Sequence, residues 1–341
     1  MRRRFLTSLR REAWRKRTIK YNSAVQFFLF VVLFSFCCGC SIKRLAVNSL
    51  ANALTEGTSS VYASDDDPEL VGEALPFALK TIEALLQANP QHKGLLISAA
   101  SGFVQYTHAY VLRPSNAVES TELETTRAGR ERAARLFLRA RDYGLRALEL
   151  SYPGISQNLT KDPVAAVSKI RREDAPALYW TGAAWASAIS VSKDNMALVG
   201  DLNIVRALME RALLLDESWG EGAIHEFFIV FAAGRTPGEG GGIAKAEEHF
   251  KRAMELNGGR SIGPLLAFAE SVCVRQQDRA QFTALLNRAL AFDVNQHPQK
   301  RLANILTQRK AKQLLEHIEE LFYFDEIEAR ESSMKSESTH D

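Results

Sequence analysis

The sequence predicts an all-α protein built from stacked pairs of helices. Apolar residues recur with the period of an α-helix in every strongly patterned segment between Pro68 and Tyr323, and pieces of the chain resemble one another at a repeating interval. The best candidate for a β-strand is Phe227–Phe231, but two alanines extend this apolar run. We therefore interpret this run as helical as well.

Each expected helix is bounded by residues that start or stop helices. Asp67 and Pro68 begin the first clear one, because an aspartate accepts hydrogen bonds from free helical N–H groups and proline suits the first turn. Asn89 and Pro90 end it. The expected helical segments are 68–88, 93–112, 128–150, 175–190, 195–215, 219–233, 243–256, 262–275, 279–292 and 298–323.

Self-similarity predicts how these helices are arranged. Ala246, Phe250 and Ala253 stand four and then three residues apart, as in the second helix of a tetratricopeptide repeat, and we expect a partner helix to cross at Ala253. Ala253 and Ala289 are 36 residues apart, close to the period of about 34 residues of that repeat. Earlier intervals are longer. The sequence therefore predicts degenerate tetratricopeptide-like helix hairpins that stack into a compact superhelical bundle.

Residues 1–39 are typical of an export signal peptide. A basic segment precedes an apolar run over 24–36, which is too short to span a membrane comfortably. Gly39 and Cys40 follow this run and resemble the lipobox of bacterial lipoproteins, whose cysteine receives lipid, palmitate included. The match is imperfect, because Cys37 stands where that motif has leucine. We predict lipidation of Cys40. An uncleaved anchor over 24–36 is the alternative, and it also leaves the rest of the chain outside the cytoplasm.

The basic character of the chain lies in this signal. Nine Lys or Arg residues and one acidic residue give residues 1–39 a net charge of +8, and because the whole chain carries +3, the remainder carries −5. Such a body lacks the basic surface that binds nucleic acid. We expect one tetratricopeptide-like helical domain over 40–325 and a polar, disordered tail over 326–341.

No arrangement of residues predicts catalysis or a cofactor. His225 and Glu226 begin like the zinc-binding helix of a metalloprotease, but Ile229 stands where that helix needs a second histidine. The glycine-rich segment 238–242 is not followed by the lysine and hydroxyl residue of a phosphate-binding loop. We therefore expect no catalytic residues, no metal and no cofactor, and a protein that is not an enzyme.

Five residues near the centre of the chain form the candidate cleft for a ligand or a partner. Tyr179, Trp180 and Trp185 lie among small residues, which let helices approach closely, so these rings either fill the core or line a cleft. His225 and Glu226 either hydrogen-bond between helices or face that cleft. We expect the tryptophans to be structural and the histidine to face the cleft.

Several of these segments together resemble the T component of TPR-associated tripartite ATP-independent periplasmic (TRAP) transporters. The segments that carry the resemblance are 179–180, 220–226, 241–253 and 301–304. The resemblance covers residues 40–324. It implies an exported lipoprotein of tetratricopeptide-like helices, without established catalytic residues, that works beside a periplasmic solute-binding P component and can form a homotrimer.

Two functions are consistent with these features. The first is an accessory lipoprotein of such a transporter that faces the periplasm, binds the solute-binding protein and holds a small organic ligand in a helical cleft. The alternative is a structural or assembly scaffold with no small-molecule role. Either protein would be anchored through Cys40, and the sequence leaves both the inner and the outer membrane open.

Overall fold

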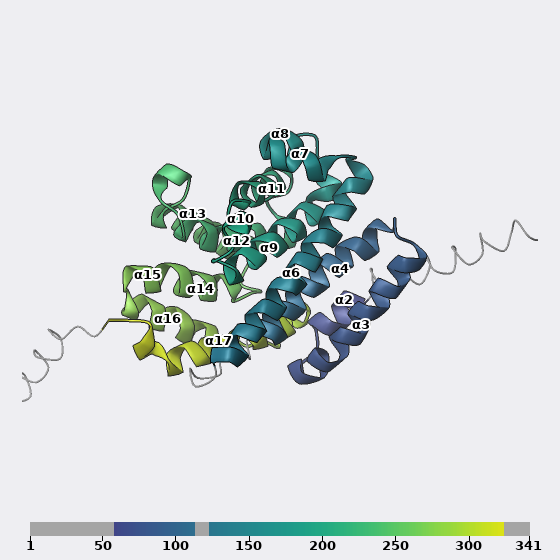
Figure 1. Cartoon of the computed structure of the whole chain (residues 1–341). Coiled ribbons are helices and arrows are strands. Elements are labelled where there is room, and N and C mark those ends of the chain that lie inside the picture. Colours follow the sequence, from purple (N-terminus) through teal and green to yellow (C-terminus); the bar gives the residue numbers. More distant parts are fainter. Residues whose placement is uncertain (1–57, 113–122, 324–341) are drawn as a thin grey trace, which may run out of the picture.

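The computed structural model describes residues 58–112 and 123–323 (Figure 1). Every regular element within these two ranges is helical and none is a β-strand, which confirms the all-α prediction. The expected export signal over 1–39, the lipidation site Cys40 and the expected tail over 326–341 lie outside these ranges. The limits of the expected domain, 40–325, therefore stay a prediction.

The first helices of the described chain pack against one another. They are α2 (Thr58–Ala63), α3 (Pro68–Ala88), α4 (Lys93–Tyr106) and the π-helical turn η1 (Thr107–Val111). Among them, α4 also packs against the long helix α6 (Leu123–Ser151). Asp67 caps α3 as expected, because its carboxylate accepts a hydrogen bond of 3.0 Å from the backbone N–H of Leu70. The segment expected as one helix over 93–112 forms α4 and continues directly into the wider π-helical turn η1.

Three long helices form the centre of the molecule: α6 (Leu123–Ser151), α9 (Ala175–Val191) and α11 (Leu202–Leu215). α6 packs against both α4 and α9 (Figure 1). Gly144 permits the close approach of α6 to α9, since a Cβ at this position would lie 2.2 Å from the hydroxyl oxygen of Thr181. The short elements between these helices are α7 (Ile155–Lys161), α8 (Pro163–Val167), η3 (Arg172–Asp174) and α10 (Met196–Val199).

The second half of the chain begins with a tightly packed helix pair, α12 (Ala223–Ala233) and α13 (Ile243–Asn257). Phe227–Phe231 lies inside α12, so the helical interpretation of this run is confirmed. Ala253 is fully buried where the start of α12 crosses it, because a Cβ at Gly222 would lie 3.2 Å from the Cα of Ala253. The remaining elements are η4 (Trp219–Glu221), η5 (Pro237–Glu239), α14 (Gly263–Phe268), η6 (Ala269–Cys273), α15 (Val274–Gln276), α16 (Arg279–Leu290), η7 (Pro298–Lys300), α17 (Arg301–Glu316) and η8 (Ile318–Glu320).

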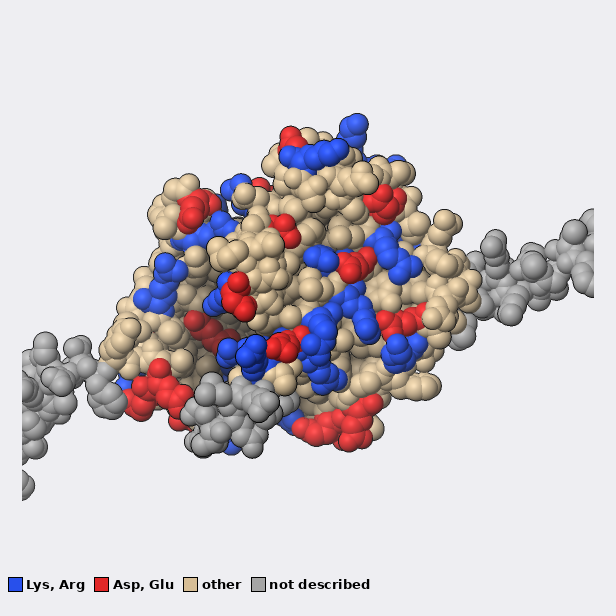
Figure 2. Space-filling view, viewed as in Figure 1, with Lys and Arg blue, Asp and Glu red and all other residues tan. Residues whose placement is uncertain are grey.

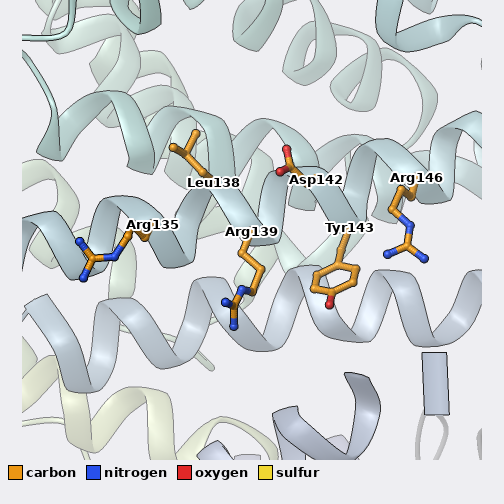
Figure 3. Close-up of a pocket in the computed structure, with 6 residues that line it drawn as sticks. All are labelled: Arg135, Leu138, Arg139, Asp142, Tyr143 and Arg146. Carbon is orange, nitrogen blue, oxygen red and sulfur yellow. The ribbon is translucent and has the colours of Figure 1, made fainter. Parts of the chain in front are cut away.

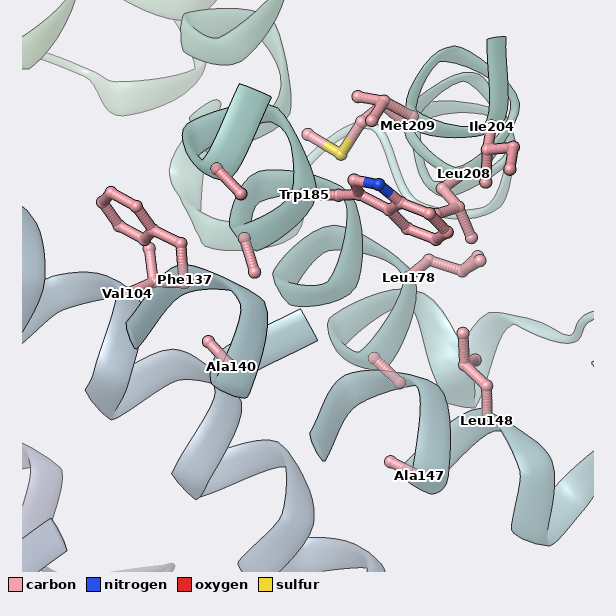
Figure 4. Close-up of a cluster of buried hydrophobic side chains, with 14 of the residues drawn as sticks. Val104, Phe137, Ala140, Ala147, Leu148, Leu178, Trp185, Ile204, Leu208 and Met209 are labelled. Atoms are coloured by element: carbon pink, nitrogen blue, oxygen red, sulfur yellow. The ribbon is translucent and has the colours of Figure 1, made fainter. Parts of the chain in front are cut away.

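Buried side chains form two core clusters that meet at α12. The first cluster extends from α3 to α12, and Figure 4 shows the part of it between α4, α6, α9 and α11. The second extends from α12 to the end of the described chain. Phe228 belongs to the first cluster and Ile229 to the second. The position of α12 is therefore fixed by packing on both of its sides.

The last long helix returns to the start of the described chain. α17 packs against α2 and α3, and Arg309 forms an ion pair with Glu69 of α3. Arg301 also donates a hydrogen bond of 3.1 Å to the backbone carbonyl of Ser64. These contacts close the helices into a ring, which agrees with the expected compact bundle. The likeness of each helix pair to a tetratricopeptide repeat stays a prediction.

Candidate functional site

A cavity of about 1250 Å³ lies inside this ring of helices. Its walls come mainly from α2, α3, α4, η1, α9, α12, α14 and α17. Most of the lining side chains are hydrophobic, among them Leu75, Val104, Phe227, Phe231 and Leu306. Ligand pockets commonly hold about 300–1000 Å³. The cavity therefore has room for an extended organic molecule.

The π-helical turn η1 shapes one wall of the cavity. His108, Ala109 and Tyr110 follow one another in the chain and all line it. Three consecutive residues of an α-helix spread over about 200° around the helix axis, so they rarely share a wall. The wider π-helical turn reduces that spread, and such turns are frequent at functional sites. The hydroxyl of Thr107 supports this turn by donating a hydrogen bond of 2.6 Å to the carbonyl of Phe103.

Tyr179 and Trp180 line the cavity near the start of α9. Their ring centroids lie 5.0 Å apart in an edge-to-face arrangement, and the ring of Trp219 lies 4.4 Å from that of Tyr179. Burial raises the pKa of Tyr179, and the negative charge of Glu226 raises it further. Ala183 continues this wall along α9 with a small side chain, which leaves the cavity wide there.

Glu226 places a carboxylate on the cavity wall, in the first turn of α12. A Cβ at Gly263, the first residue of α14, would lie 2.6 Å from Oε1 and 2.8 Å from Oε2 of this carboxylate. Glu226 has some accessible surface because the cavity reaches it, yet the surrounding protein atoms exclude most water. This burial raises its pKa to about 7, and the positive charge of Lys300 opposes the shift. Near neutral pH the group is therefore divided between its charged and neutral forms.

A loop in an unusual conformation fixes the start of α12. Gly220, Glu221 and Gly222 have φ angles of 63°, 59° and 94°. For Glu221 this left-handed conformation costs about 1–2 kcal/mol. Ion pairs of 3.0 Å to Arg260 and 3.0 Å to Lys300 hold the Glu221 carboxylate in place. Lys300 is therefore engaged with Glu221, next to Glu226 but not paired with it.

Trp185, one of the five residues of the candidate cleft, does not line the cavity and is a structural residue, as we expected of the tryptophans. It is 6% exposed and lies between α9 and Met209 of α11 (Figure 4). Its indole N–H donates a hydrogen bond of 3.1 Å to Asp201. Trp185 follows Trp180 by five positions, which turns the helix by about 140° beyond one full turn. The two tryptophans therefore face different sides, and only Trp185 is a core residue.

His225 also lies away from the cavity, although we expected it to face the cleft. Its Nδ1 atom lies 2.8 Å from Nδ1 of His249 on α13, and its Nε2 atom lies 3.1 Å from Glu217. Glu226 lies one residue and about 100° further round the helix than His225, and it lines the cavity whereas His225 does not. The interhelix hydrogen bond is thus made by the histidine, and the cavity is reached by the glutamate.

The walls supplied by α3, η1 and α17 were not found from the sequence. Phe77 of α3 lines the cavity and is 79% exposed, and Leu302 of α17 also lines it. Both occupy ordinary positions of amphipathic helices, and no local motif marks them. They become one wall only because α17 packs back onto α2 and α3.

A second, shallower hollow of about 370 Å³ lies on the outer side of α6. Figure 2 shows Lys and Arg side chains gathered on this face, and Figure 3 shows three arginines in the hollow. Arg139 lies 3.6 Å from Glu83 and 5.4 Å from the ring centroid of Phe103. Tyr143 donates a hydrogen bond of 2.8 Å to the same Glu83. Because these groups satisfy one another, the internal cavity is the stronger candidate site.

The fold and the cavity define an all-helical protein that encloses an apolar space. In the part of the chain that the structure describes, no three His, Cys, Asp or Glu side chains are grouped to hold a metal ion. Over 58–112 and 123–323, no helix is both long enough and apolar enough to cross a membrane.

A family model for the TRAP transporter T-component matches residues 64–322, and the chain belongs to this family. It is also 31% identical over 303 residues to an uncharacterized protein of Treponema pallidum (strain Nichols), covering 84% of this chain and 94% of that relative. The T-components are accessory components of transporters and not a family of enzymes. The chain is accordingly an accessory component of a TRAP transporter.

Proposed function

We propose that this accessory component holds a small amphipathic organic molecule in its cavity and docks onto the solute-binding P component of the transporter. The observation that carries the proposal is a cavity of about 1250 Å³ whose largely hydrophobic wall contains the carboxylate of Glu226. Tyr179, Trp180 and Glu226 are the site residues that we assign. Trp185 and His225 support the helices that carry them.

The hydrophobic walls favour the apolar part of such a ligand. Burying about 300 Å² of apolar ligand surface contributes about 7–8 kcal/mol at about 25 cal/mol per Å². Association costs about 4–15 kcal/mol in lost freedom of motion. Hydrophobic burial alone therefore gives weak binding, and polar groups must add affinity and fix the orientation. Glu226, Lys193 and Arg235 are charged groups on the cavity wall that fit this role.

The predicted export signal and the family membership support the rest of the proposal. A lipid on Cys40 would anchor the chain to a membrane with the helical body on the periplasmic side, because two acyl chains suffice for stable anchoring. The docking partner is the periplasmic solute-binding protein, and a homotrimer is the assembly that the resemblance implies.

Filling the cavity tests the ligand-holding function. Ala183 lines the cavity on α9, whereas Ala165 of α8 is exposed on the outside. We expect the wild-type protein and the control Ala165→Phe to bind the fluorescent apolar probe N-phenyl-1-naphthylamine, and Ala183→Phe to lose most of this binding. No binding by the wild type, or equal binding by Ala183→Phe, would contradict the function and favour the scaffold alternative.

The docking function has its own test. We expect the purified chain to form a complex with the P component of the same transporter in size-exclusion chromatography. Separate elution of the two proteins at micromolar concentrations, with and without probe in the cavity, would contradict it.

A further inference from the structure

Two acidic side chains of the described residues line the cavity, and only one of them has a partner. Glu239 accepts hydrogen bonds of 3.0 Å from the backbone N–H of Thr236 and 2.8 Å from its hydroxyl. Glu226 accepts no hydrogen bond from a residue within 58–112 or 123–323, and it forms no ion pair there. Glu226 is therefore the cavity carboxylate that is free to bind something else.

A carboxylate held among apolar groups without a partner is costly. The positive charge that acts on Glu226 is that of Lys300, whose Nζ lies 3.0 Å from the carboxylate of Glu221. Because Arg260 also binds Glu221 at 3.0 Å, this ion pair is part of the support of the loop before α12. Lys300 therefore lowers the cost of the Glu226 charge from a distance but does not satisfy it.

The rings around Glu226 favour one sign of ligand charge. Tyr179 and Trp180 line the cavity together with Phe227, the residue that follows Glu226. The face of an aromatic ring carries negative electrostatic potential, so it attracts a cation and repels an anion. Trp219 packs behind Tyr179 at 4.4 Å between ring centroids and holds that ring in place. The carboxylate therefore favours a cation, and every ring that presents its face to the cavity favours the same kind of group.

The basic side chains of the cavity lie at the other end of α12 and α9. Arg235 follows Glu226 by nine residues, which corresponds to about 13 Å along a helix. Its guanidinium lies 4.3 Å from the ring centroid of Phe231. Lys193 follows the end of α9, far from Tyr179 at the start of that helix. A ligand anion would therefore bind at the Arg235 end and not beside Glu226.

We propose that the molecule held in this cavity carries an organic ammonium group, which Glu226 binds beside Tyr179 and Trp180 while the apolar part lies along α12 towards Arg235. This inference rests on the proposed ligand-holding function. It commits to a protonated amine or quaternary ammonium, and it excludes a simple carboxylate at the Glu226 end.

Three probes of equal chain length test the charge preference. We would measure binding of decylamine, decanoate and decanol to the full-length protein by calorimetry at pH 8.5, where Glu226 is largely ionised. The variants are Glu226→Gln and the matched control Glu239→Gln, which makes the same chemical change on the same cavity. We expect the wild type and Glu239→Gln to bind decylamine at least about tenfold more tightly than decanol. We expect Glu226→Gln to lose most of this preference, because only the aromatic rings then favour the cation.

The outcomes separate this inference from the function on which it rests. Binding of all three probes with equal affinity, or a preference for decanoate, would overturn the ammonium assignment and leave the cavity as a binding site. A decylamine preference of unchanged size in Glu226→Gln would also overturn it. Binding of none of the probes would overturn both proposals. Thermal melting of each variant shows whether a loss of binding reflects a loss of folding.

Discussion

The Nδ1 atoms of His225 and His249 lie 2.8 Å apart and join α12 to α13 behind the cavity wall. Nε2 of His225 lies 3.1 Å from Oε1 of Glu217, a carboxylate that only accepts hydrogen bonds. His225 is therefore assigned as donating from Nε2 and accepting at Nδ1, and His249 as donating from Nδ1. Both rings are then neutral. Burial favours this state, because it lowers the pKa of His225 and lowers that of His249 to about 4.

Replacing His225 by alanine should destabilise the fold without removing a cavity group. The change leaves the ring N–H of His249 without its acceptor, at a cost of about 1–3 kcal/mol. The free energy of unfolding in urea measures this loss, and His317→Ala, at an exposed position directly after α17, is the control. Loss of probe binding in His225→Ala at unchanged stability would show that His225 acts at the cavity after all.

Glu226 and His249 should have opposite effects on stability between pH 6.5 and 4.5. The folded pKa of His249, about 4, lies below its ordinary value of 6.5, so the unfolded chain takes up this proton first and stability falls as the pH falls. The folded pKa of Glu226, about 7, lies above its ordinary value of 4.5, so stability rises as the pH falls. Each shift corresponds to at most about 3 kcal/mol, and the two largely offset.

The variant Glu226→Gln should expose this compensation. Tyr179, whose pKa burial raises above its ordinary value, does not change protonation in this range. We expect the free energy of unfolding of the variant to fall by about 2–3 kcal/mol more than that of the wild type between pH 6.5 and 4.5. Parallel pH profiles for the two proteins in urea titrations would show that Glu226 is not held in an environment that raises its pKa.

The helices were predictable from the sequence because their signals are local. Asp67 caps α3, and the spacing of apolar residues around Phe227–Phe231 defines α12. Interactions between residues close in the sequence were therefore sufficient to predict these helices. The cavity was predictable only in part. Tyr179 and Glu226 stood out as polar or aromatic residues in apolar segments, but Leu302 lines the cavity only because α17 closes the ring.

Which residue of a helix faces the cavity depends on the rotation of that helix about its axis. The types of residue in the helix do not determine this rotation. His225 and Glu226 are both polar residues of one apolar helix, and packing on both sides of α12 decides which one reaches the cavity. The same applies to Trp180 and Trp185 on α9. The sequence identified the right helices and assigned their faces wrongly for His225 and Trp180.

The two tryptophans of α9 should therefore respond differently to truncation. Trp185→Ala removes a core side chain and its hydrogen bond to Asp201, and it should cost about 3–5 kcal/mol. Trp180→Ala removes a ring from the cavity wall and should cost less stability while weakening binding of decylamine. Urea denaturation and calorimetry measure the two effects. Equal destabilisation with unchanged binding would remove Trp180 from the site.

Gly263 should be required for the position of the Glu226 carboxylate. In Gly263→Ala the added Cβ would lie 2.6 Å from Oε1, so the flexible end of the glutamate must move. We expect little change in stability but several-fold weaker decylamine binding. Gly238→Ala is the control, because nothing lies within 4 Å of a Cβ at that position. Unchanged decylamine binding in Gly263→Ala would separate Glu226 from the binding site.

The lipid anchor is tested at Cys40. We expect Cys40→Ala to move the protein from the membrane fraction to the soluble periplasmic fraction, because the variant lacks the thiol that receives the acyl chains. Cell fractionation with immunodetection measures this. Retention of the variant in the membrane would indicate that the apolar run over 24–36 is an uncleaved anchor.

The central claim is that the ring of helices holds an amphipathic molecule with its charged end at Glu226. A crystal structure of the full-length protein with a bromine-labelled long-chain alkylamine tests this directly, since anomalous scattering locates the bromine. We predict the bromine inside the cavity near Arg235 and the ammonium nitrogen within hydrogen-bond distance of the Glu226 carboxylate. Bromine found only outside the cavity, or an ammonium group directed away from Glu226, would contradict the account.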